Sequence, residues 1–322
     1  MKVVIIGSGV AGVTVAEALA KSARHNVLLV TAETAGYYSR PRLSHGFALS
    51  DEAAAKIVLK GFDALASGVR TIAGTRVERI DRQSRNLVLE GGKRLDYEVL
   101  VLATGSAARI PPSLAPHRER FFTLNSLDDL TALRRLRAEC AGRRRRWAVI
   151  GGGLIGCEAA SDLNKAGDSV TLFHRESRLL ERQLTPSQSQ TLHEHFAAWG
   201  IEIRYSQDLR DLPAGFDGVI VCVGFAPRVE LAMEAGLATE RGIVVDEYLR
   251  TRDSCIYAVG DVAQVGSRLY AFVSPIRSQA LWLAQHLDGR TVEPWMPPAF
   301  VPVIKVHGFK PETESGRLAQ AA

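Results

Sequence analysis

Two glycine-rich segments have the residue types and spacing that bind phosphate groups. The first consists of Gly7, Ser8, Gly9, Val10, Ala11 and Gly12, and the second of Gly151, Gly152, Gly153, Leu154, Ile155 and Gly156. Each follows a short apolar run, at residues 3–6 and 147–150. In a strand–turn–helix unit such glycines allow a tight turn, a close approach of the backbone to a pyrophosphate, and close packing of the helix on the strand. The free N–H groups and the positive dipole at the helix start then bind the phosphates.

The elements around the first segment fit such a unit. Small and apolar residues continue at helical spacing after Gly12, and a second apolar run at residues 27–30 ends near Glu33. An acid about 20 residues beyond the glycines can accept hydrogen bonds from a ribose. The segment therefore predicts a dinucleotide site. The plainer alternative is a βαβ unit whose acid is only a solvated strand end.

The second segment repeats this pattern, with a helix expected through residues 159–163 and a strand at 170–173. An internal repeat of this size predicts an α/β fold with two Rossmann-like dinucleotide-binding domains. Each domain is expected to be a parallel sheet with helices and a small antiparallel excursion.

The strand of the second repeat is not followed directly by an acid. The chain reads His174, Arg175, Glu176, Ser177 and Arg178 at this point. A basic cluster suits the 2′-phosphate of NADPH, whereas an acid would accept a hydrogen bond from the ribose 2′-hydroxyl of NADH. The sequence therefore favours NADPH, with His174 and Arg175 binding the phosphate. It leaves NADH open, because Glu176 lies in the cluster.

Other small or polar residues follow predicted strands, where ligands bind in a doubly wound sheet. The candidates are Ala103, Thr104 and Gly105 after residues 99–102, and Gly224 after residues 219–223. Asp261 follows another apolar run and is placed to bind a ribityl hydroxyl, a role compatible with capping the next helix. Arg40 lies in a polar, proline-stiffened loop, where it would meet a phosphate or a ring edge unless the loop is an ordinary surface loop.

The totals are those of a globular protein. The chain has 322 residues, 46% of them hydrophobic and 23% charged, which is enough for about two domains. No apolar run approaches the length of a membrane span, and we expect no signal peptide because the chain enters its first strand directly. The four cysteines form no C-x-x-C pair, which favours a cytoplasmic location and argues against a zinc ribbon. No metal site is predicted.

The formal net charge is +5, a mild excess that can steer an acidic partner. The arginines at residues 143–146 form the densest basic patch. A solvated loop is the simpler explanation of this patch, because no aromatic-interleaved groove or DNA-binding motif accompanies it. We therefore expect neither nucleic acid nor membrane as a partner.

Taken together, these motifs resemble the flavoprotein reductases with two dinucleotide-binding domains. The two glycine turns, the Ala-Thr-Gly turn and the Gly-Asp pair at residues 260–261 occur in that family's order. Within it, residues 38–44 (Tyr-Ser-Arg-Pro-Arg-Leu-Ser) look like those of rubredoxin reductases and of the reductases for flavorubredoxin nitric oxide reductases. The resemblance covers nearly the whole chain and is strengthened by residues 156–158, 242–246 and 303–305.

This resemblance implies FAD in a discontinuous domain of residues 1–118 and 245–322, and NADPH or NADH in a domain of residues 119–244. The FAD contacts that it implies are the first glycine turn, Glu33, Arg40, Val77, Thr104, Gly105, Arg109, Asp261, Val273 and Lys305. It also implies that Glu158 faces the junction where hydride passes from nicotinamide to flavin. Lys305, or the helix start near Pro275, would stabilise the negative charge of reduced flavin.

The branch of the family is indicated by the absence of a cysteine. Disulfide reductases of this type carry a redox cysteine after the second strand, where this chain has Ser39, Arg40 and Pro41. Without a thiol relay, electrons should leave the flavin to an external carrier. The predicted function is an FAD-dependent NAD(P)H oxidoreductase that reduces a small acidic electron carrier such as rubredoxin. The alternatives are a ferredoxin reductase of an oxygenase system, a flavin- and nucleotide-binding protein with little turnover, and a small-molecule oxidase.

Two features depart from the family pattern. His45 stands where the related ferredoxin reductases have lysine. The family also adds a C-terminal interface domain, which this chain is expected to lack, and residues 311–322 are expected to form a frayed polar tail. The sequence makes no prediction of the oligomeric state.

Overall fold

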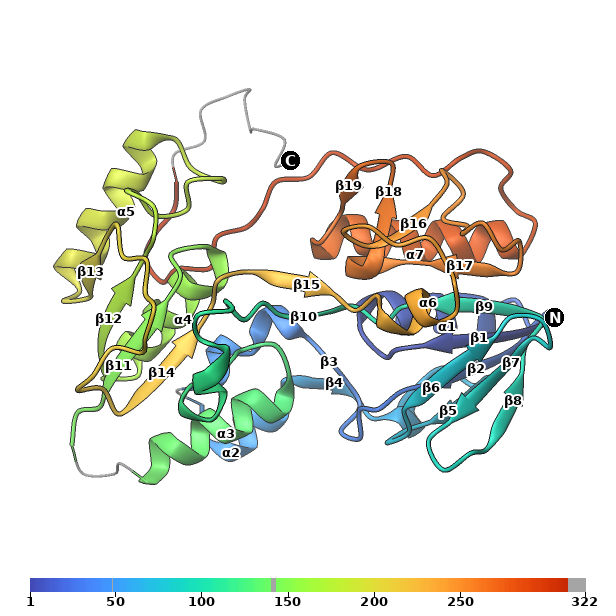
Figure 1. Cartoon of the computed structure of the whole chain (residues 1–322), viewed down its shortest axis with the longest axis horizontal. Coiled ribbons are helices and arrows are strands. Elements are labelled where there is room, and N and C mark those ends of the chain that lie inside the picture. Colours follow the sequence, from blue (N-terminus) through green and yellow to red (C-terminus); the bar gives the residue numbers. More distant parts are fainter. Residues whose placement is uncertain (48, 140–142, 312–322) are drawn as a thin grey trace. The chain divides into compact units, whose positions relative to one another are not determined.

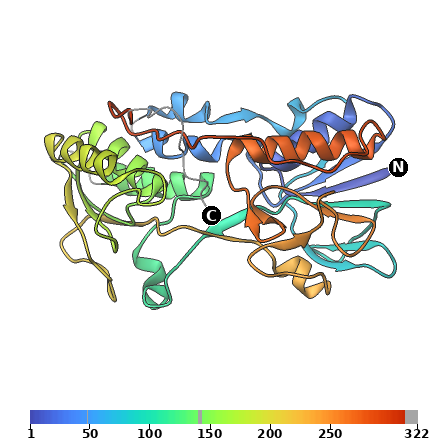
Figure 2. The ribbon, with the colours of Figure 1, turned by 90° about the horizontal axis from the view of Figure 1, so that it is seen from above.

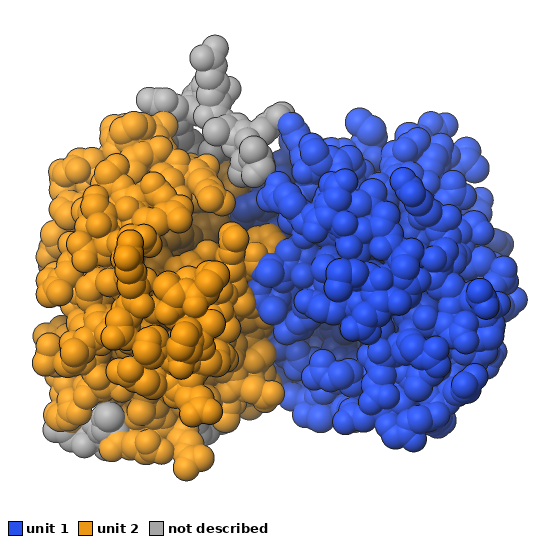
Figure 3. Space-filling view, viewed as in Figure 1, with its two compact units in different colours: residues 1–39, 58–107, 226–300 blue, residues 40–57, 108–225, 301–322 orange. Residues whose placement is uncertain are grey.

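The computed structural model describes residues 1–47, 49–139 and 143–311. Unit 1 contains residues 1–39, 58–107 and 226–300, and unit 2 contains residues 40–57, 108–225 and 301–322 (Figure 1, Figure 3). The units divide the chain at different residues from the predicted domains, since residues 40–57, 108–118 and 301–322 fall in unit 2 and residues 226–244 in unit 1. Cys140 and nearly all of the predicted tail lie outside the described residues.

Unit 1 is organised around a parallel sheet of five strands. These are β1 (Lys2–Ile6), β2 (Asn26–Val30), β5 (Val69–Ile72), β9 (Val99–Leu102) and β17 (Ile256–Ala258). Their order across the sheet is β17-β9-β1-β2-β5. All residues of β9 and all but the first of β1 are buried. Such continuous apolar runs are typical of central strands that are covered on both faces.

Two helices of unit 1 pack against each other, namely α1 (Val10–Ala20) and α7 (Val273–Leu287, orange-red in Figure 2). Helix α1 also contacts β1, β2 and β5 through its buried face. The other elements of unit 1 are β3 (Tyr37–Tyr38), β4 (Val58–Lys60), the 3₁₀ turn Phe62–Ala64, β6 (Val77–Asp81), β7 (Asn86–Leu89), β8 (Arg94–Asp96), α6 (Glu230–Glu234), β16 (Ile243–Val245), the 3₁₀ turn Gly260–Val262, β18 (Ala263–Val265) and β19 (Arg268–Leu269). Strands β6, β7 and β8 form an antiparallel sheet, which is the predicted excursion.

Unit 2 contains a second parallel sheet. Its strands are β11 (Arg146–Ile150), β12 (Ser169–Phe173), β13 (Glu202–Arg204) and β14 (Gly218–Val221), in the order β13-β12-β11-β14. Its helices are α2 (Asp51–Ala55), α3 (Leu127–Glu139), α4 (Leu154–Lys165) and α5 (Pro186–Ala198), with 3₁₀ turns at Arg40–Arg42, Ser44–Phe47 and Ala115–Arg120. Strands β10 (Ser106–Ala108) and β15 (Phe225–Pro227), where the chain passes from one unit to the other, form a separate two-stranded sheet.

The predicted α/β fold with two parallel sheets is confirmed. Strand β9 begins and ends at the predicted residues, and α5 begins at a capping box in which Thr185 and Gln188 bond reciprocally. The strand pairs β11–β12, β11–β14 and β12–β13 of the four-stranded sheet are parallel, and the antiparallel sheet of β6, β7 and β8 belongs to unit 1. None of the helices in the described residues is long and apolar enough to cross a membrane.

The arginine patch at residues 143–146 makes its contacts within unit 2. The Arg143 guanidinium donates to Asp217 Oδ2 at 2.7 Å, and the backbone N–H of Arg146 donates to the same oxygen at 2.9 Å. These hydrogen bonds, that from Arg143 above all, lower the pKa of Asp217 to about 2. Arg145 pairs with Asp168 at 3.3 Å. The patch thus links the starts of β11 and β14.

Replacing Asp217 by asparagine should destabilise the fold at neutral pH and matter less in acid. The folded carboxyl has a pKa of about 2 against its usual 3.8, so its contribution is complete above about pH 4 and is lost as the pH falls toward 2. Allowing for solvent screening of this partly exposed pair, we expect a loss of about 1 kcal/mol in the free energy of unfolding at pH 7.

Urea unfolding between pH 7 and pH 3 measures this difference, with the exposed Glu119→Gln as a charge-matched control. The loss in the free energy of unfolding caused by Asp217→Asn should be about half as large at pH 3 as at pH 7. An effect independent of pH would contradict the ion pair as its cause.

Candidate cofactor sites

The first glycine turn joins β1 to α1, and its backbone requires glycine at two positions. Gly7 has φ +108° and donates its N–H to Val30 O at 2.8 Å. A Cβ at Gly7 would lie 2.2 Å from Ala103 O, and a Cβ at Gly12 would lie 1.9 Å from Gly7 O. Because both contacts are with backbone atoms, a side chain at either position would force the turn open. Gly7 therefore permits the turn, and Gly12 permits the close approach of α1 to β1.

The second glycine turn, between β11 and α4, has the same constraints. Gly151 has φ +113° and donates its N–H to Phe173 O at 2.8 Å. A Cβ at Gly151 would lie 2.3 Å from Cys222 O, and a Cβ at Gly156 would lie 1.8 Å from Gly151 O. The two turns are the same local structure built twice, so that β11, α4, β12 and β14 repeat β1, α1, β2 and β9.

Both helices begin in a way that leaves their first N–H groups available to a ligand. The N-cap residues Gly9 and Gly153 make no side-chain cap, and neither helix has an acidic residue in its first turn. A Cβ at Gly153 would meet nothing within 4 Å. An uncapped helix start with open space beside it fits a pyrophosphate. Both turns therefore fit the phosphates of a dinucleotide.

The strand registers align the two repeats residue by residue. In the first repeat Ile6 pairs with Val30, and in the second Ile150 pairs with Phe173. Each residue after Val30 therefore has a counterpart after Phe173, and each residue after Ile6 has one after Ile150.

The residue pairs Ser8–Thr31 and Gly152–His174 occupy corresponding positions in the two repeats, and they hold the two turns by different contacts. In the first repeat the hydroxyls of Ser8 and Thr31 are buried and hydrogen-bonded at 2.8 Å. In the second repeat the N–H of Gly152 donates to Nδ1 of His174 at 3.0 Å. A Cβ at Gly152 would lie 2.7 Å from Cγ of His174. The imidazole thus occupies the space that the serine side chain takes in the first repeat.

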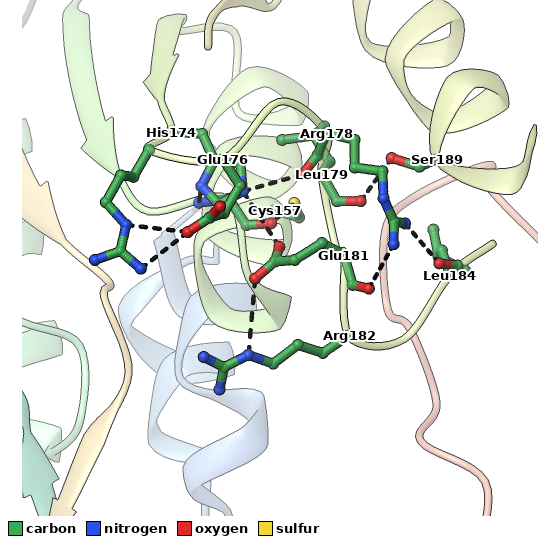
Figure 4. Close-up of polar contacts among 11 residues, drawn as sticks. Cys157, His174, Glu176, Arg178, Leu179, Glu181, Arg182, Leu184 and Ser189 are labelled. Atoms are coloured by element: carbon green, nitrogen blue, oxygen red, sulfur yellow. Dashed lines mark hydrogen bonds and ion pairs between the residues drawn. The ribbon is translucent and has the colours of Figure 1, made fainter. Parts of the chain in front are cut away.

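His174 is therefore part of the second turn. The sequence had led us to expect that its side chain would present a cation to a phosphate, and it does not. Its Nδ1 accepts a hydrogen bond and so carries no proton, while Nε2 lies 3.0 Å from Arg178 O and 3.3 Å from Glu181 Oε2 (Figure 4). The ring is buried and, in this hydrogen-bond pattern, neutral. Arg178 donates to the carbonyl oxygens of Glu181 and Leu184 and is occupied within the same loop.

Glu176 takes the position in unit 2 that Glu33 takes in unit 1. Each lies three residues beyond the last residue of its strand, β12 or β2. Arg175 is exposed, and its guanidinium donates to Glu176 Oε1 at 2.9 and 3.0 Å. A single arginine paired with a carboxylate is not the basic cluster that a 2′-phosphate requires. An acid at this position fits the 2′-hydroxyl of NADH.

Glu33 is held beside the end of β2. The Tyr38 hydroxyl donates to Glu33 Oε1 at 2.8 Å, and the Glu33 N–H donates to Thr31 Oγ1 at 3.1 Å. The N–H of Gly74 donates to Glu33 O at 3.1 Å, which brings the segment leading to the buried Val77 beside this acid. Tyr38 thus joins the candidate site through a contact with Glu33 that the sequence did not reveal.

Asp261 lies just beyond the end of β17, next to the first glycine turn. Ser106 Oγ donates to Asp261 Oδ2 at 2.7 Å, and a Cβ at Gly260 would lie 3.0 Å from Cβ of Ala11. Gln279 of α7 accepts from the Gly260 N–H at 2.8 Å, while its own Nε2 is buried without a hydrogen-bond partner among the described residues. An acceptor on a bound cofactor would satisfy such a donor. Ser106 and Gln279 therefore join the candidate site, although sequence reasoning missed both.

The remaining unit 1 candidates surround the same sheet edge. Thr104 Oγ1 donates to Arg228 O at 2.9 Å, and Gly105, with φ +68°, accepts from the Arg228 N–H at 2.9 Å. Val273 is the first residue of α7, whose start has no side-chain cap, and it is 42% exposed. The helix start thus offers free N–H groups, as predicted for the segment near Pro275.

Three residues predicted to contact FAD, namely Arg40, Arg109 and Lys305, belong to unit 2, whereas the first glycine turn belongs to unit 1. The Nε of Arg40 donates to Asn125 O at 3.1 Å. Arg109 is exposed, and its N–H donates to the carbonyl of Gly224, which follows β14 with φ +111°.

Glu158 and Lys305, the two predicted catalytic residues, contact each other. Glu158 lies on α4 just beyond the second glycine turn and is 7% exposed. Its Oε2 accepts from Lys305 Nζ at 2.9 Å, and its Oε1 accepts from the Lys305 N–H at 3.1 Å. Lys305 Nζ also donates to Pro41 O. The carboxylate therefore fixes both the backbone and the ammonium group of Lys305.

The two cysteines nearest the second glycine turn do not have the environment of a redox thiol. Cys157 and Cys222 are both buried and free, and Cys157 Sγ donates to Gly152 O at 3.4 Å. Burial raises the pKa of Cys157 well above its usual value and that of Cys222 to about 12. Such thiols remain protonated at neutral pH and are inert.

Comparison with known proteins places the chain in a family. Residues 1–280 match the family model described as pyridine nucleotide-disulphide oxidoreductase. The chain is 34% identical over 321 residues to the nitric oxide reductase FlRd-NAD(+) reductase of Salmonella gallinarum, which covers 94% of this chain and 82% of that protein. The chain belongs to the pyridine nucleotide-disulphide oxidoreductase family.

Solved structures agree with this assignment. NADH:rubredoxin oxidoreductase from Clostridium acetobutylicum matches with a TM-score of 0.82 and 25% identity, over 95% of this chain and 80% of that chain. The ferredoxin reductase for the CYP199A2 system of Rhodopseudomonas palustris matches with a TM-score of 0.83 and 29% identity, over 92% of this chain and 78% of that chain. The predicted enzyme class, an oxidoreductase that uses FAD and NAD(P)H, is confirmed.

Replacing Gly152 by serine should destabilise unit 2, because the new Cβ would meet the His174 ring at 2.7 Å. We expect a loss of about 1–3 kcal/mol in the free energy of unfolding. The double variant Gly152→Ser/His174→Thr should regain most of it, because it copies the Ser8–Thr31 pair of the first repeat. Thermal unfolding monitored by circular dichroism measures both.

Gly153→Ser is the matched control, because a Cβ there meets nothing within 4 Å and should leave the unfolding temperature unchanged. If the double variant were as unstable as Gly152→Ser alone, the exchange of imidazole for serine would not explain the two turns.

Proposed function

We propose that this chain oxidises NADH and passes the electrons, through bound FAD, to a small acidic electron-carrier protein of the rubredoxin type in the cytoplasm. The observation that carries the choice of nucleotide is the position of Glu176, which follows β12 as Glu33 follows β2. The name of the Salmonella relative, an NAD(+) reductase, supports the same choice.

NADH is preferred to NADPH because the residues that favoured NADPH are engaged elsewhere. His174 accepts from Gly152, and Arg178 donates to two carbonyl groups of its own loop. Arg175 is paired with Glu176, whose carboxylate would repel a 2′-phosphate. The same carboxylate would accept a hydrogen bond from a 2′-hydroxyl.

We assign FAD to unit 1 and the nicotinamide nucleotide to unit 2. Bound FAD supplies the chemistry that the chain's own residues lack, since it takes up a hydride and releases electrons one at a time. The residues of unit 1 then bind and orient it: the first glycine turn holds the pyrophosphate, Glu33 the ribose, and Asp261 a ribityl hydroxyl. Ser106 fixes the Asp261 carboxylate by its 2.7 Å hydrogen bond.

Lys305 is proposed to offset the negative charge of reduced flavin, with Glu158 as its positioning partner. The buried carboxylate holds the ammonium group at 2.9 Å, and Pro41 O accepts a second hydrogen bond from it. The third N–H of the ammonium remains for a ligand. Held in this way, the side chain is ordered before any cofactor charge develops, which reduces the reorganisation that the reaction requires.

An external protein acceptor follows from the chemistry of the thiols. The segment after β2 contains Ser39, Arg40 and Pro41 in place of a redox cysteine, and Cys157 is buried and inert. A rubredoxin-type carrier is supported by the name of the Clostridium structure, and a net charge of +5 suits an acidic partner. The likeness to a ferredoxin reductase at 29% identity favours a ferredoxin-type carrier as the second candidate.

Glu176→Ala should lower kcat/KM for NADH by about 10-fold or more, because a charged hydrogen bond to the ribose is lost. The value for NADPH should stay the same or rise, since a like charge near the 2′-phosphate is removed. Anaerobic stopped-flow reduction of the flavin by each nucleotide measures both. The control is Asp208→Ala, an exposed acid in the segment after β13, whose residue Gln207 donates its N–H to His174 O. If the native chain used NADPH more efficiently than NADH, the proposed role of Glu176 would be rejected.

The acceptor is identified by mixing the reduced enzyme with rubredoxin or with a [2Fe–2S] ferredoxin under anaerobic conditions. We expect rapid reduction of rubredoxin, and a rate that falls as ionic strength rises, because opposite charges steer the encounter. Flavin reduction by NADH should change little over the same salt range. Faster reduction of ferredoxin would select the second candidate, and reduction of neither protein would rule out both.

A further inference from the structure

Three side chains of metal-binding type meet in unit 2, apart from the residues assigned above. His45 lies in the 3₁₀ turn Ser44–Phe47, Asp162 on α4, and His307 in the segment 301–311, which forms neither helix nor strand. Nδ1 of His45 lies 3.0 Å from Asp162 Oδ1, and Nε2 of His307 lies 2.6 Å from the same oxygen. One ligand atom of each residue lies within 4.8 Å of the other two.

Asp162 is the buried centre of this cluster, and its side chain is 4% exposed. Burial alone would raise the pKa of its carboxyl, but hydrogen bonds from His45, Ser44 and His307 outweigh burial and lower the pKa. The carboxylate is therefore an anion at neutral pH. The two imidazole side chains are 31% and 26% exposed, so a cation can reach the cluster from solvent.

The hydrogen-bond pattern shows where the protons of the cluster lie. Lys165 Nζ is 3.3 Å from Nδ1 of His307, and an ammonium group can only donate. Nδ1 of His307 therefore accepts, and the ring proton lies on Nε2, facing Asp162. Because a carboxylate only accepts, Nδ1 of His45 also carries a proton toward Asp162. Two protons thus occupy the space between two ring nitrogens and one anionic oxygen.

We propose that His45, Asp162 and His307 form a binding site for a divalent first-row transition-metal ion, with Zn²⁺ as the representative. Two imidazole nitrogens and one carboxylate oxygen are a donor set that such ions bind, and three protein ligands leave a position for water. Tetrahedral bonds of about 2.0–2.2 Å place neighbouring ligand atoms roughly 3.4 Å apart. The present distances are 3.0 and 2.6 Å to Asp162 Oδ1, and all three ligand atoms lie within 4.8 Å of one another, so only small side-chain movements are required. The cation takes the place of the two facing protons, and each ring stays neutral because its proton moves to the nitrogen that faces away from the metal.

Two other histidine–aspartate pairs show what is particular to this cluster. His117 lies 3.2 Å from Asp211, and His25 lies 2.9 Å from Asp288. Each pair has one imidazole, and in the described part of the chain the cluster of His45 is the group in which three metal-binding side chains converge. Sequence reasoning predicted no metal site, because Asp162 is 117 residues from His45 and 145 from His307.

A bound ion would join the Ser44–Phe47 turn, α4 and the segment 301–311. That segment already contacts α4, through the His307 N–H that donates to Ser161 Oγ at 3.0 Å and through the Lys305–Glu158 pair. The ion would add bonds two residues away from Lys305. Binding should therefore stabilise the segment that carries the ammonium group.

The test uses the full FAD-loaded chain with any affinity tag removed, treated with EDTA and dialysed. Titration with ZnCl₂ by calorimetry should show one Zn²⁺ per chain, and the unfolding temperature should rise with Zn²⁺ concentration. Co²⁺ should give visible absorption bands of a bound ion. These readouts are independent of NADH oxidation, so they separate the metal site from the proposed reductase activity.

His307→Asn and His45→Asn should each weaken Zn²⁺ binding by about 100-fold or more, since each removes one ligand of three. His117→Asn is the matched control and should bind as the native chain does. Lys165→Gln should tighten binding several-fold, because a metal-bound His307 carries its proton on Nδ1, where the ammonium group opposes it. Circular dichroism and flavin content verify that each variant is folded.

The proposal is overturned if the native chain binds no Zn²⁺, or if His307→Asn and His117→Asn bind it equally. It is also overturned if Lys165→Gln weakens binding, because the lysine would then be supporting the site and the proton assignment would be wrong.

Discussion

The rest of the structure depends on a contact that only glycine permits, between the first turn of a helix and the carbonyl group at the end of the preceding strand. Gly12 makes it over Gly7 O, and Gly156 makes it over Gly151 O. Each contact brings a helix start close to the sheet edge. In both sheets the strand before the glycine turn, β1 or β11, has the next strand of its repeat on one side and a later strand, β9 or β14, on the other. In doubly wound folds, ligands bind in the crevice at the point where the strand order reverses in this way.

The parts of this architecture that are encoded locally could be predicted. Buried parallel strands are continuous apolar runs, and glycine turns have fixed spacing, so the two repeats and most strand ends follow from short stretches of sequence. The contacts that complete the sites join residues far apart in the chain. Ser106 reaches Asp261, and Lys305 reaches Glu158. No local pattern reports such pairs, although the position of Ser106 directly after Gly105 was a usable signal.

The basic residues after β12 were harder to interpret from the sequence, because residue type does not reveal side-chain direction. Three basic residues follow β12, but one imidazole turns inward and one guanidinium binds its own loop. A signal for the inward turn was present in the sequence. Gly152 stands where the first repeat has Ser8, and the missing side chain leaves room for the ring of His174. Comparing the repeats with each other is more informative here than counting charges.

Helix α4 carries both a feature that the local sequence predicts and contacts with residues far away in the chain. Its first turn follows the glycine turn that the sequence predicts to bind a nucleotide. Its next turns contact the segment 301–311 through Glu158, Ser161 and Asp162. Residues three and four apart lie on one face of a helix, so these three side chains share a side. The geometry of Gly156 and the position of Lys305 are therefore coupled through one rigid helix. A change that moved the glycine turn would also move the carboxylate that holds the ammonium group.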